Sequence, residues 1–147
     1  MLINYINTNK TTVAILKDYL DQCWKLDNNP LLEIERLKAQ IESPQGGSIN
    51  KSQGRGSVDR EEFVAGAIDR IAVLQHGCSV AKSYFDVFNP AWERLTDDER
   101  YYLTSFYIEN DDGKGIKRIM DKYHIEKSTA YRRAETALGR LSKLLFW

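Results

Sequence analysis

Hydrogen-bond donors gather near the end of the chain, between positions 127 and 140. They recur outside a stripe of alanine and leucine, so they share the polar face of one helix. The face combines lysine, arginine, hydroxyl side chains and one tyrosine: Lys127, Ser128, Thr129, Tyr131, Arg132, Arg133, Thr136 and Arg140. Such groups donate to base edges, and the cations among them neutralise phosphates. The chemistry that this face offers is the binding of a nucleic acid.

Charge is distributed unevenly along the chain, although the formal net charge is zero. Residues 1–113 carry 12 Lys and Arg against 18 Asp and Glu, hence −6, and residues 114–147 carry 9 against 3, hence +6. A polyanion would therefore meet the C-terminal end. Charge alone leaves one alternative open, namely a structural helix whose basic face is only solvated.

Two helices at the spacing of a helix-turn-helix position these donors. The first holds Ile116, Ile119, Met120 and Tyr123, and the turn is His124-Ile125-Glu126, with Ile125 pointing inward. The second runs from near Lys127 to about Leu145. Its inner face consists of small and branched apolar residues: Ala130, Ala134, Ala137, Leu138, Leu141 and Leu145. In such motifs the start of the second helix reads bases. We expect Arg132, Ser128 and Thr129 to contact bases, and phosphates to be held by Lys117, Lys127, Arg133 and Arg140.

A further helix precedes this pair. Thr96-Asp97-Asp98-Glu99 has the spacing of a capping box, in which the threonine hydroxyl and the glutamate carboxylate satisfy each other's amides. The apolar face that follows is broad: Tyr102, Leu103, Phe106 and Tyr107. The segment 110–115 contains two glycines and lacks the ligands of a calcium loop. We therefore interpret it as a turn.

The segment from Leu95 to Leu145 resembles region four of bacterial sigma factors, the helix-turn-helix that reads the −35 promoter element. The resemblance rests on the runs LTDDER from Leu95, GIKRIMDKYHI from Gly115 and STAYRRAETALGRL from Ser128. In layout, the whole chain is similar to small sigma-like regulators of phages and prophages, the RinA/ArpU type that controls late genes. The resemblance implies double-stranded DNA as the partner, with RNA polymerase and a second copy of the chain as further candidates. Residues 1–94 do not resemble the clamp-binding region of sigma factors, so we expect a transcription regulator, not a complete sigma factor.

Three positions depart from the usual motif. Met120 occupies a position where a small residue is typical, His124 replaces the turn glycine, and Ala130 replaces a branched residue. Met120 and Ala130 should face each other, so that the larger side chain is offset by the smaller one. Histidine tolerates positive φ better than most residues do, which suits it to the turn.

Helical periodicity also extends through the N-terminal part. Val13, Leu16, Leu20 and Cys23 predict one buried face, and Asn29 and Pro30 predict the start of the next helix. A longer seam alternates strictly at spacings of three and four: Val64, Ala67, Ile71, Leu74, Cys78, Ala81, Phe85 and Phe88. The sequence leaves open whether Gly77 interrupts this helix, and Asn89-Pro90 is expected to close the arm. Between the helices, residues near 43–58 are rich in glycine and serine and predict a flexible loop.

These elements predict an all-α fold, a long antiparallel helical hairpin of coiled-coil type followed by a sigma-region-four-like helix-turn-helix bundle. The predicted domains are residues 1–94 for the hairpin arm and residues 95–147 for the DNA-binding part. No apolar run reaches the ~20 residues of a membrane span, so we expect no membrane contact. We expect a cytoplasmic location in a bacterial host, where Cys23 and Cys78 would be free thiols.

Catalytic and metal-binding patterns are not recognisable in the sequence. His76 and His124 are the only histidines, and neither lies at the spacing of a metal or nucleophile site. We expect no enzyme activity, no cofactor and no metal. Two other functions stay open: a phage small terminase-like DNA-packaging protein, which would form a ring, and a helical interaction module that does not bind DNA.

Overall fold

The computed structural model describes residues 7–28, 30–42 and 56–147, with the side chains of 56–58 excepted. The fold is all-α, as predicted, and these residues contain no strand. The helices are α1 (Thr8–Asp27), α2 (Pro30–Glu42), α4 (Gly56–Glu93), α5 (Asp97–Leu103), η2 (Thr104–Ile108, a π-helical segment), α6 (Gly115–Tyr123) and α7 (Lys127–Phe146). No helix among them is long and apolar enough to cross a membrane.

The chain divides into two compact units. We call Met1–Gln22 with Tyr84–Trp147 the bundle, and Cys23–Ser83 the arm, so that α1 and α4 each contribute to both. The predicted boundary near residue 94 does not coincide with this division. The reason is that Leu16 of α1 and Phe88 of α4 lie in the same apolar core as the C-terminal helices.

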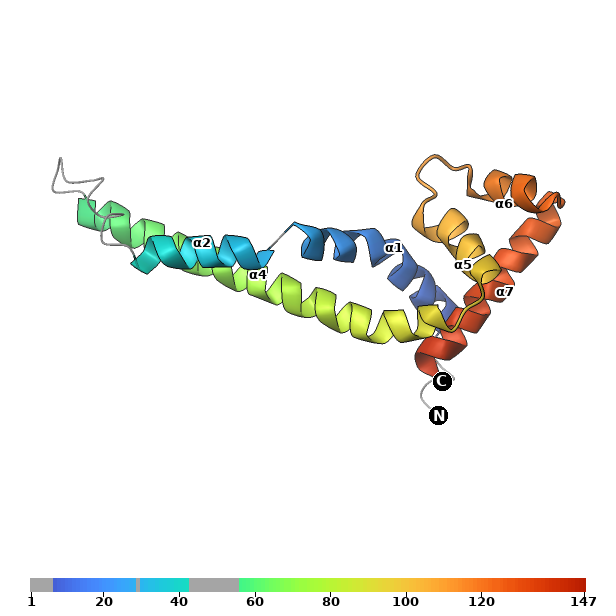
Figure 1. Ribbon diagram of the computed structural model, residues 1–147, viewed down its shortest axis with the longest axis horizontal. Coiled ribbons are helices and arrows are strands. Elements are labelled where there is room, and N and C mark those ends of the chain that lie inside the picture. The colour runs from blue at the N-terminus through green and yellow to red at the C-terminus, as the bar shows by residue number, and fades with distance from the viewer. Residues whose placement is uncertain (1–6, 29, 43–55) are drawn as a thin grey trace. The chain divides into compact units, whose positions relative to one another are not determined.

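The arm is an antiparallel pair of helices, as Figure 1 shows for α2 and the first half of α4. Ile34 and Leu37 of α2 pack on Ala67 and Ile71 of α4. Near the far end of α2, the Arg60 guanidinium donates to the carbonyl oxygens of residues 40 and 41, at 3.0 and 2.5 Å. Pro30 begins α2 as predicted, whereas Asn29 lies outside the described residues.

The predicted seam of α4 is confirmed, because all eight of its residues are buried or half-buried. The helix α4 continues through Gly77 without a break. Two expected limits are wrong. Residues 56–58 of the predicted loop are already helical, while 43–55 lie outside the described residues. The helix also passes through Pro90 to Glu93. Arg100 caps its end, donating from Nε to the carbonyl of Trp92 (3.0 Å) and from Nη2 to that of Glu93 (2.7 Å).

The bundle has one continuous core. Leu16, Phe88, Leu103, Ile119 and Leu141 are each at most 1% exposed and belong to the same cluster. On α1 the buried face differs from the predicted one, since Leu20 is 45% exposed. Aromatic contacts decide this rotation of α1: the Tyr19 ring lies 5.2 Å from that of Phe88, and the Tyr84 hydroxyl donates to the carbonyl of Ile15 at 2.5 Å.

The predicted capping box starts α5. Thr96 Oγ1 accepts from the amide of Glu99 at 3.2 Å, and Glu99 Oε1 accepts from the amide of Thr96 at 2.9 Å. The helix then widens into η2, where the amide of Glu109 donates to the carbonyl of Thr104 at 2.8 Å. Widened segments of this kind are rare. No pattern in the sequence predicts this segment, which ends the helix before the turn at 109–114.

Candidate nucleic-acid interface

The helix-turn-helix is formed by α6, a short turn and α7. The second helix begins at Lys127 as predicted, whereas α6 already begins at Gly115, the last residue of the segment expected to be a turn. His124 follows α6 with φ 52° and ψ 49°, the left-handed conformation that the missing glycine would adopt. Its amide donates to the carbonyl of Met120, and the amide of Ile125 bonds to the same oxygen at 3.2 Å. His124 is the one non-glycine residue with positive φ in the part of the chain that the structure describes.

The contact face of α7 is made of small residues. Ala130 and Ala134 are fully buried, and Ala137 is 1% exposed. Met120 is half-buried and packs on the cluster that contains Ala130, and a direct contact between the two stays a prediction. Because alanines let two helices approach closely, α7 can lie against both α5 and α6, which it contacts (Figure 1).

The start of α6 is fixed by the turn before it. The amide of Gly115 donates to Asn110 Oδ1 at 2.7 Å. A Cβ atom on Gly115 would lie 2.1 Å from the carbonyl oxygen of Ser105, so the close approach needs glycine. Arg118 adds a second link, since its guanidinium reaches both Asp112 carboxylate oxygens (3.0 and 3.1 Å) and the carbonyls of Ser105 and Glu109.

The Asp112 carboxylate accepts hydrogen bonds from two groups of this turn and of α6. The amide of Lys114 donates to its Oδ1 at 3.0 Å, and the Arg118 guanidinium lies beside it. These bonds, with the Lys114 amide first, hold the pKa of the Asp112 carboxyl below its usual value, and partial burial opposes them. The carboxylate is therefore charged at neutral pH and holds the Arg118 guanidinium against the turn at 109–114.

Most of the predicted donors lie on the open side of α7 and α6. Lys117, Lys127, Ser128, Tyr131, Arg132, Thr136 and Arg140 are exposed, and Thr129 and Arg133 are half-buried. Within the described residues, the side chains of Lys117, Lys127 and Arg132 have no ion-pair partner. These three cations are accordingly available to an external anion.

Two of the predicted phosphate contacts already have partners inside the bundle. Arg133 Nη1 donates to the Tyr102 hydroxyl at 3.1 Å, and its guanidinium lies over the Tyr123 ring. Arg140 donates to Glu99 Oε1 and to the carbonyl of residue 94, both at 3.1 Å. The sequence could not separate these residues from Arg132, because the separation depends on residues about 30 to 45 positions away.

An aromatic cluster joins the end of α6 to α5, where the Tyr123 ring contacts those of Tyr101 and Tyr102. The Tyr123 hydroxyl donates to Asp98 Oδ1 at 2.8 Å, and the Lys122 ammonium lies 3.8 Å from the centre of the Tyr101 ring. Burial, followed by the hydrogen bond to Asp98, raises the pKa of the Tyr123 phenol well above its ordinary value. Tyr123 therefore stays protonated and keeps donating to the first turn of α5.

One exposed cation was missed by the sequence reasoning. Lys114 immediately precedes α6 and is exposed, three positions before Lys117. Its position before the first turn of a helix in the basic part of the chain was the available signal. Lys114 and Lys117 extend the positive surface beyond α7.

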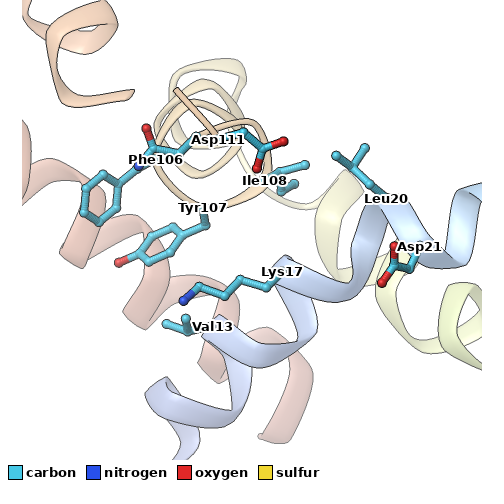
Figure 2. Close-up of a pocket in the computed structure, with 9 residues that line it drawn as sticks. Val13, Lys17, Leu20, Asp21, Phe106, Tyr107, Ile108 and Asp111 are labelled. Atoms are coloured by element: carbon cyan, nitrogen blue, oxygen red, sulfur yellow. The ribbon is translucent and has the colours of Figure 1, made fainter. Parts of the chain in front are cut away.

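Figure 2 shows a pocket on another part of the bundle, with a volume of about 610 Å³. It lies between α1 and the stretch formed by the end of η2 and the start of the turn after it. Its lining residues are Val13, Lys17, Leu20, Asp21, Phe106, Tyr107, Ile108, Asn110 and Asp111. None of the predicted donors lines it. No group of three or more His, Cys, Asp or Glu residues that could hold a metal ion occurs in the described part of the chain.

The geometry thus yields two helices joined by a short turn, with exposed basic side chains on their open side. Comparison with protein-family models, with curated proteins and with solved structures gave no match for this chain.

Proposed function

We propose that the chain binds double-stranded DNA through α6 and α7 and regulates transcription as a sigma-region-four-like regulator of phage or prophage late genes. In this proposal α7 enters the major groove with its N-terminal half. Arg132, Ser128 and Thr129 contact base edges, and Lys117 and Lys127 contact phosphates.

The observation that carries the proposal is the state of Arg132. Its side chain is exposed on the second turn of α7, and it has no partner among the described residues, whereas Arg133, the next residue, is bonded to Tyr102. An arginine that is not held by its own protein, on a helix held by both α5 and α6, suits bidentate contact with guanine. The excess of positive charge in residues 114–147 favours the same partner.

Arg133 and Arg140 take a different role from the one that the sequence suggested. Because their guanidinium groups bond to Tyr102 and Glu99, we assign them to holding α7 on α5. RNA polymerase as a further partner rests on the sigma-like resemblance alone.

The test is selection of bound duplexes from a random pool by the full chain. We expect an enriched motif. Repeating the selection with R132A should relax the preference at one position, with a loss of about 1–3 kcal/mol for the preferred base. Failure of the wild-type chain to enrich any sequence, together with no binding at low salt, would refute the proposal.

Lys143 provides the matched control. It is exposed on the last turns of α7, away from the proposed reading half, and K143A removes the same charge as R132A does. We expect K143A to retain the selected motif unchanged. If both variants relaxed the preference equally, charge and not base contact would explain the binding.

A further inference from the structure

The arm buries little apolar surface of its own. Its core consists of Ile34, Leu37, Ala67 and Ile71, with two half-buried residues, Ile41 and Leu74, at the edge. Small units with so limited a core are usually stabilised by disulfides, metals or association with another subunit. Cys23 of α1 and Cys78 of α4 are free thiols, so no disulfide joins these two helices. The arm therefore calls for a further apolar contact.

A groove on the arm is the place for such a contact. It has a volume of about 420 Å³ and lies between α4, the end of α1 and the start of α2. Its lining residues are Trp24, Lys25, Asn28, Pro30, Glu33, Arg70, Val73, Leu74, Gly77 and Cys78. Two large apolar side chains at this groove face solvent: Trp24 is 67% exposed and Val73 is 62% exposed. Aromatic side chains bury about 150–250 Å² each, so covering Trp24 would be a substantial gain.

The same groove contains both a protruding side chain and a space that could receive one. Trp24 supplies the protruding side chain. At Gly77 no atom lies within 4 Å of where a Cβ would be, so the surface of α4 is open there. A two-fold interface uses one surface twice, so it needs a projection and a recess on the same patch. This groove meets that condition.

The charges of the arm fit a second copy better than a charged partner. Residues 23–83 carry eight Lys and Arg against eight Asp and Glu, so their net charge is zero. Two arms therefore do not repel each other, and a polyanion is not attracted. Both signs line the groove, with Lys25 and Arg70 beside Glu33, which already accepts two hydrogen bonds from Arg36 of its own helix at 2.7 and 2.9 Å. The groove therefore presents no uncompensated anionic patch to a second copy.

We propose that the occupant of this groove is a second copy of the chain, and that two arms associate about a two-fold axis with Trp24 of each packed over Val73 and Gly77 of the other. This inference concerns the arm alone and does not depend on DNA binding. A standard interface buries about 800 Å² per partner, which is more than the groove alone offers. The remainder would come from exposed residues on the Val73 side of α4. Ile68 precedes Val73 by five positions, which places it about 140° away around the helix and outside this side.

The experiment is a measurement of molar mass by light scattering and sedimentation velocity on the full chain, at concentrations up to about 100 µM. We expect a mass twice the 17.0 kDa of one chain. A monomer throughout that range, or a ring of more than two copies, would overturn the proposal.

Two variants locate the contact. W24A removes the protruding side chain, and G77Q fills the recess without meeting any atom of its own chain at Cβ. Because glycine is a poor helix former, G77Q should leave α4 at least as helical, so a loss of the dimer would not reflect unfolding. We expect each variant to raise the dimer dissociation constant at least about tenfold.

Ile68 provides matched controls on the same helix. It is 54% exposed and does not line the groove. We expect I68A and I68Q to dimerise as the wild type does, with equal helical content by circular dichroism in all variants. Dimers that persist in both W24A and G77Q would contradict the assignment of the groove, as would equal losses in the Ile68 controls.

Discussion

Arg140 and Glu99 are 41 positions apart in the sequence and form an ion pair with 3.1 Å between Nη1 and Oε1. The same glutamate oxygen accepts from the amide of Thr96, so the capping box of α5 is tied to α7. Arg140 is half-exposed, which limits the strength of the pair, whereas Glu99 is 16% exposed. The pair therefore links the start of one helix to the proposed reading helix.

Replacing Arg140 should affect stability and not the count of phosphate contacts. We expect R140A to lower the free energy of unfolding by up to about 1 kcal/mol, because a half-exposed pair is screened by water. Denaturant titration measures this. The slope of log K for DNA against log salt should stay as in the wild type.

Lys117 should behave in the opposite way. We expect K117A to leave the free energy of unfolding unchanged, since its side chain has no ion-pair partner within the described residues. It should lower the magnitude of the salt slope by about one, which fluorescence anisotropy at several salt concentrations measures. An unchanged slope in K117A together with a reduced slope in R140A would reverse the two roles.

The left-handed residue His124 offers a test of the turn. With φ 52°, it occupies a conformation that costs a non-glycine residue about 1–2 kcal/mol. We expect H124G to raise the melting temperature and H124V to lower it. An H124V chain as stable as the wild type would show that the turn adopts another conformation.

Gly115 tests the close approach at the start of α6. We expect G115A to lower the free energy of unfolding by about 1–3 kcal/mol, because its Cβ would lie 2.1 Å from the carbonyl oxygen of Ser105. Gly139 in α7 is the control, since no atom lies within 4 Å of its Cβ position. G139A should stabilise the chain by about 0.5–1 kcal/mol through helix propensity. Equal effects of the two variants would argue against the contact.

Asp112 gives a pH-dependent prediction. Its pKa is lowered in the folded chain by the Lys114 amide and by Arg118, so its stabilising effect is present above the unfolded value near 3.8 and is lost as pH falls through the folded pKa. We expect D112N to be less stable than the wild type at neutral pH, with the difference vanishing in acid. Unfolding curves at several pH values measure this, and a difference that persists unchanged below the folded pKa would contradict it.

Local patterns were enough to predict several parts of the fold. The capping box at Thr96, the seam of α4 and the left-handed turn at His124 each depend on residues a few positions apart, and the structure confirms all three. Their physics is local, because a cap, a helix face and a turn are each decided within one or two turns of chain.

The features that sequence reasoning missed depend on distant residues. Leu20 was expected to be buried, but α1 turns Tyr19 toward Phe88 of α4 instead. The helix α4 continues past Pro90, and its end is capped by Arg100 of the following helix. The proposed site shows the same limit, since only the positions of Tyr102 and Glu99 distinguish Arg133 and Arg140 from Arg132.

The central claim is that the exposed donors of α7 read DNA. The most direct measurement is the affinity of the full chain for its selected duplex and for a scrambled duplex, at several salt concentrations. The account predicts tighter binding to the selected duplex and a fall in both affinities as salt increases, with R132A losing the difference between the two duplexes and K143A keeping it. Equal affinity of the wild-type chain for both duplexes, or no binding at low salt, would contradict it.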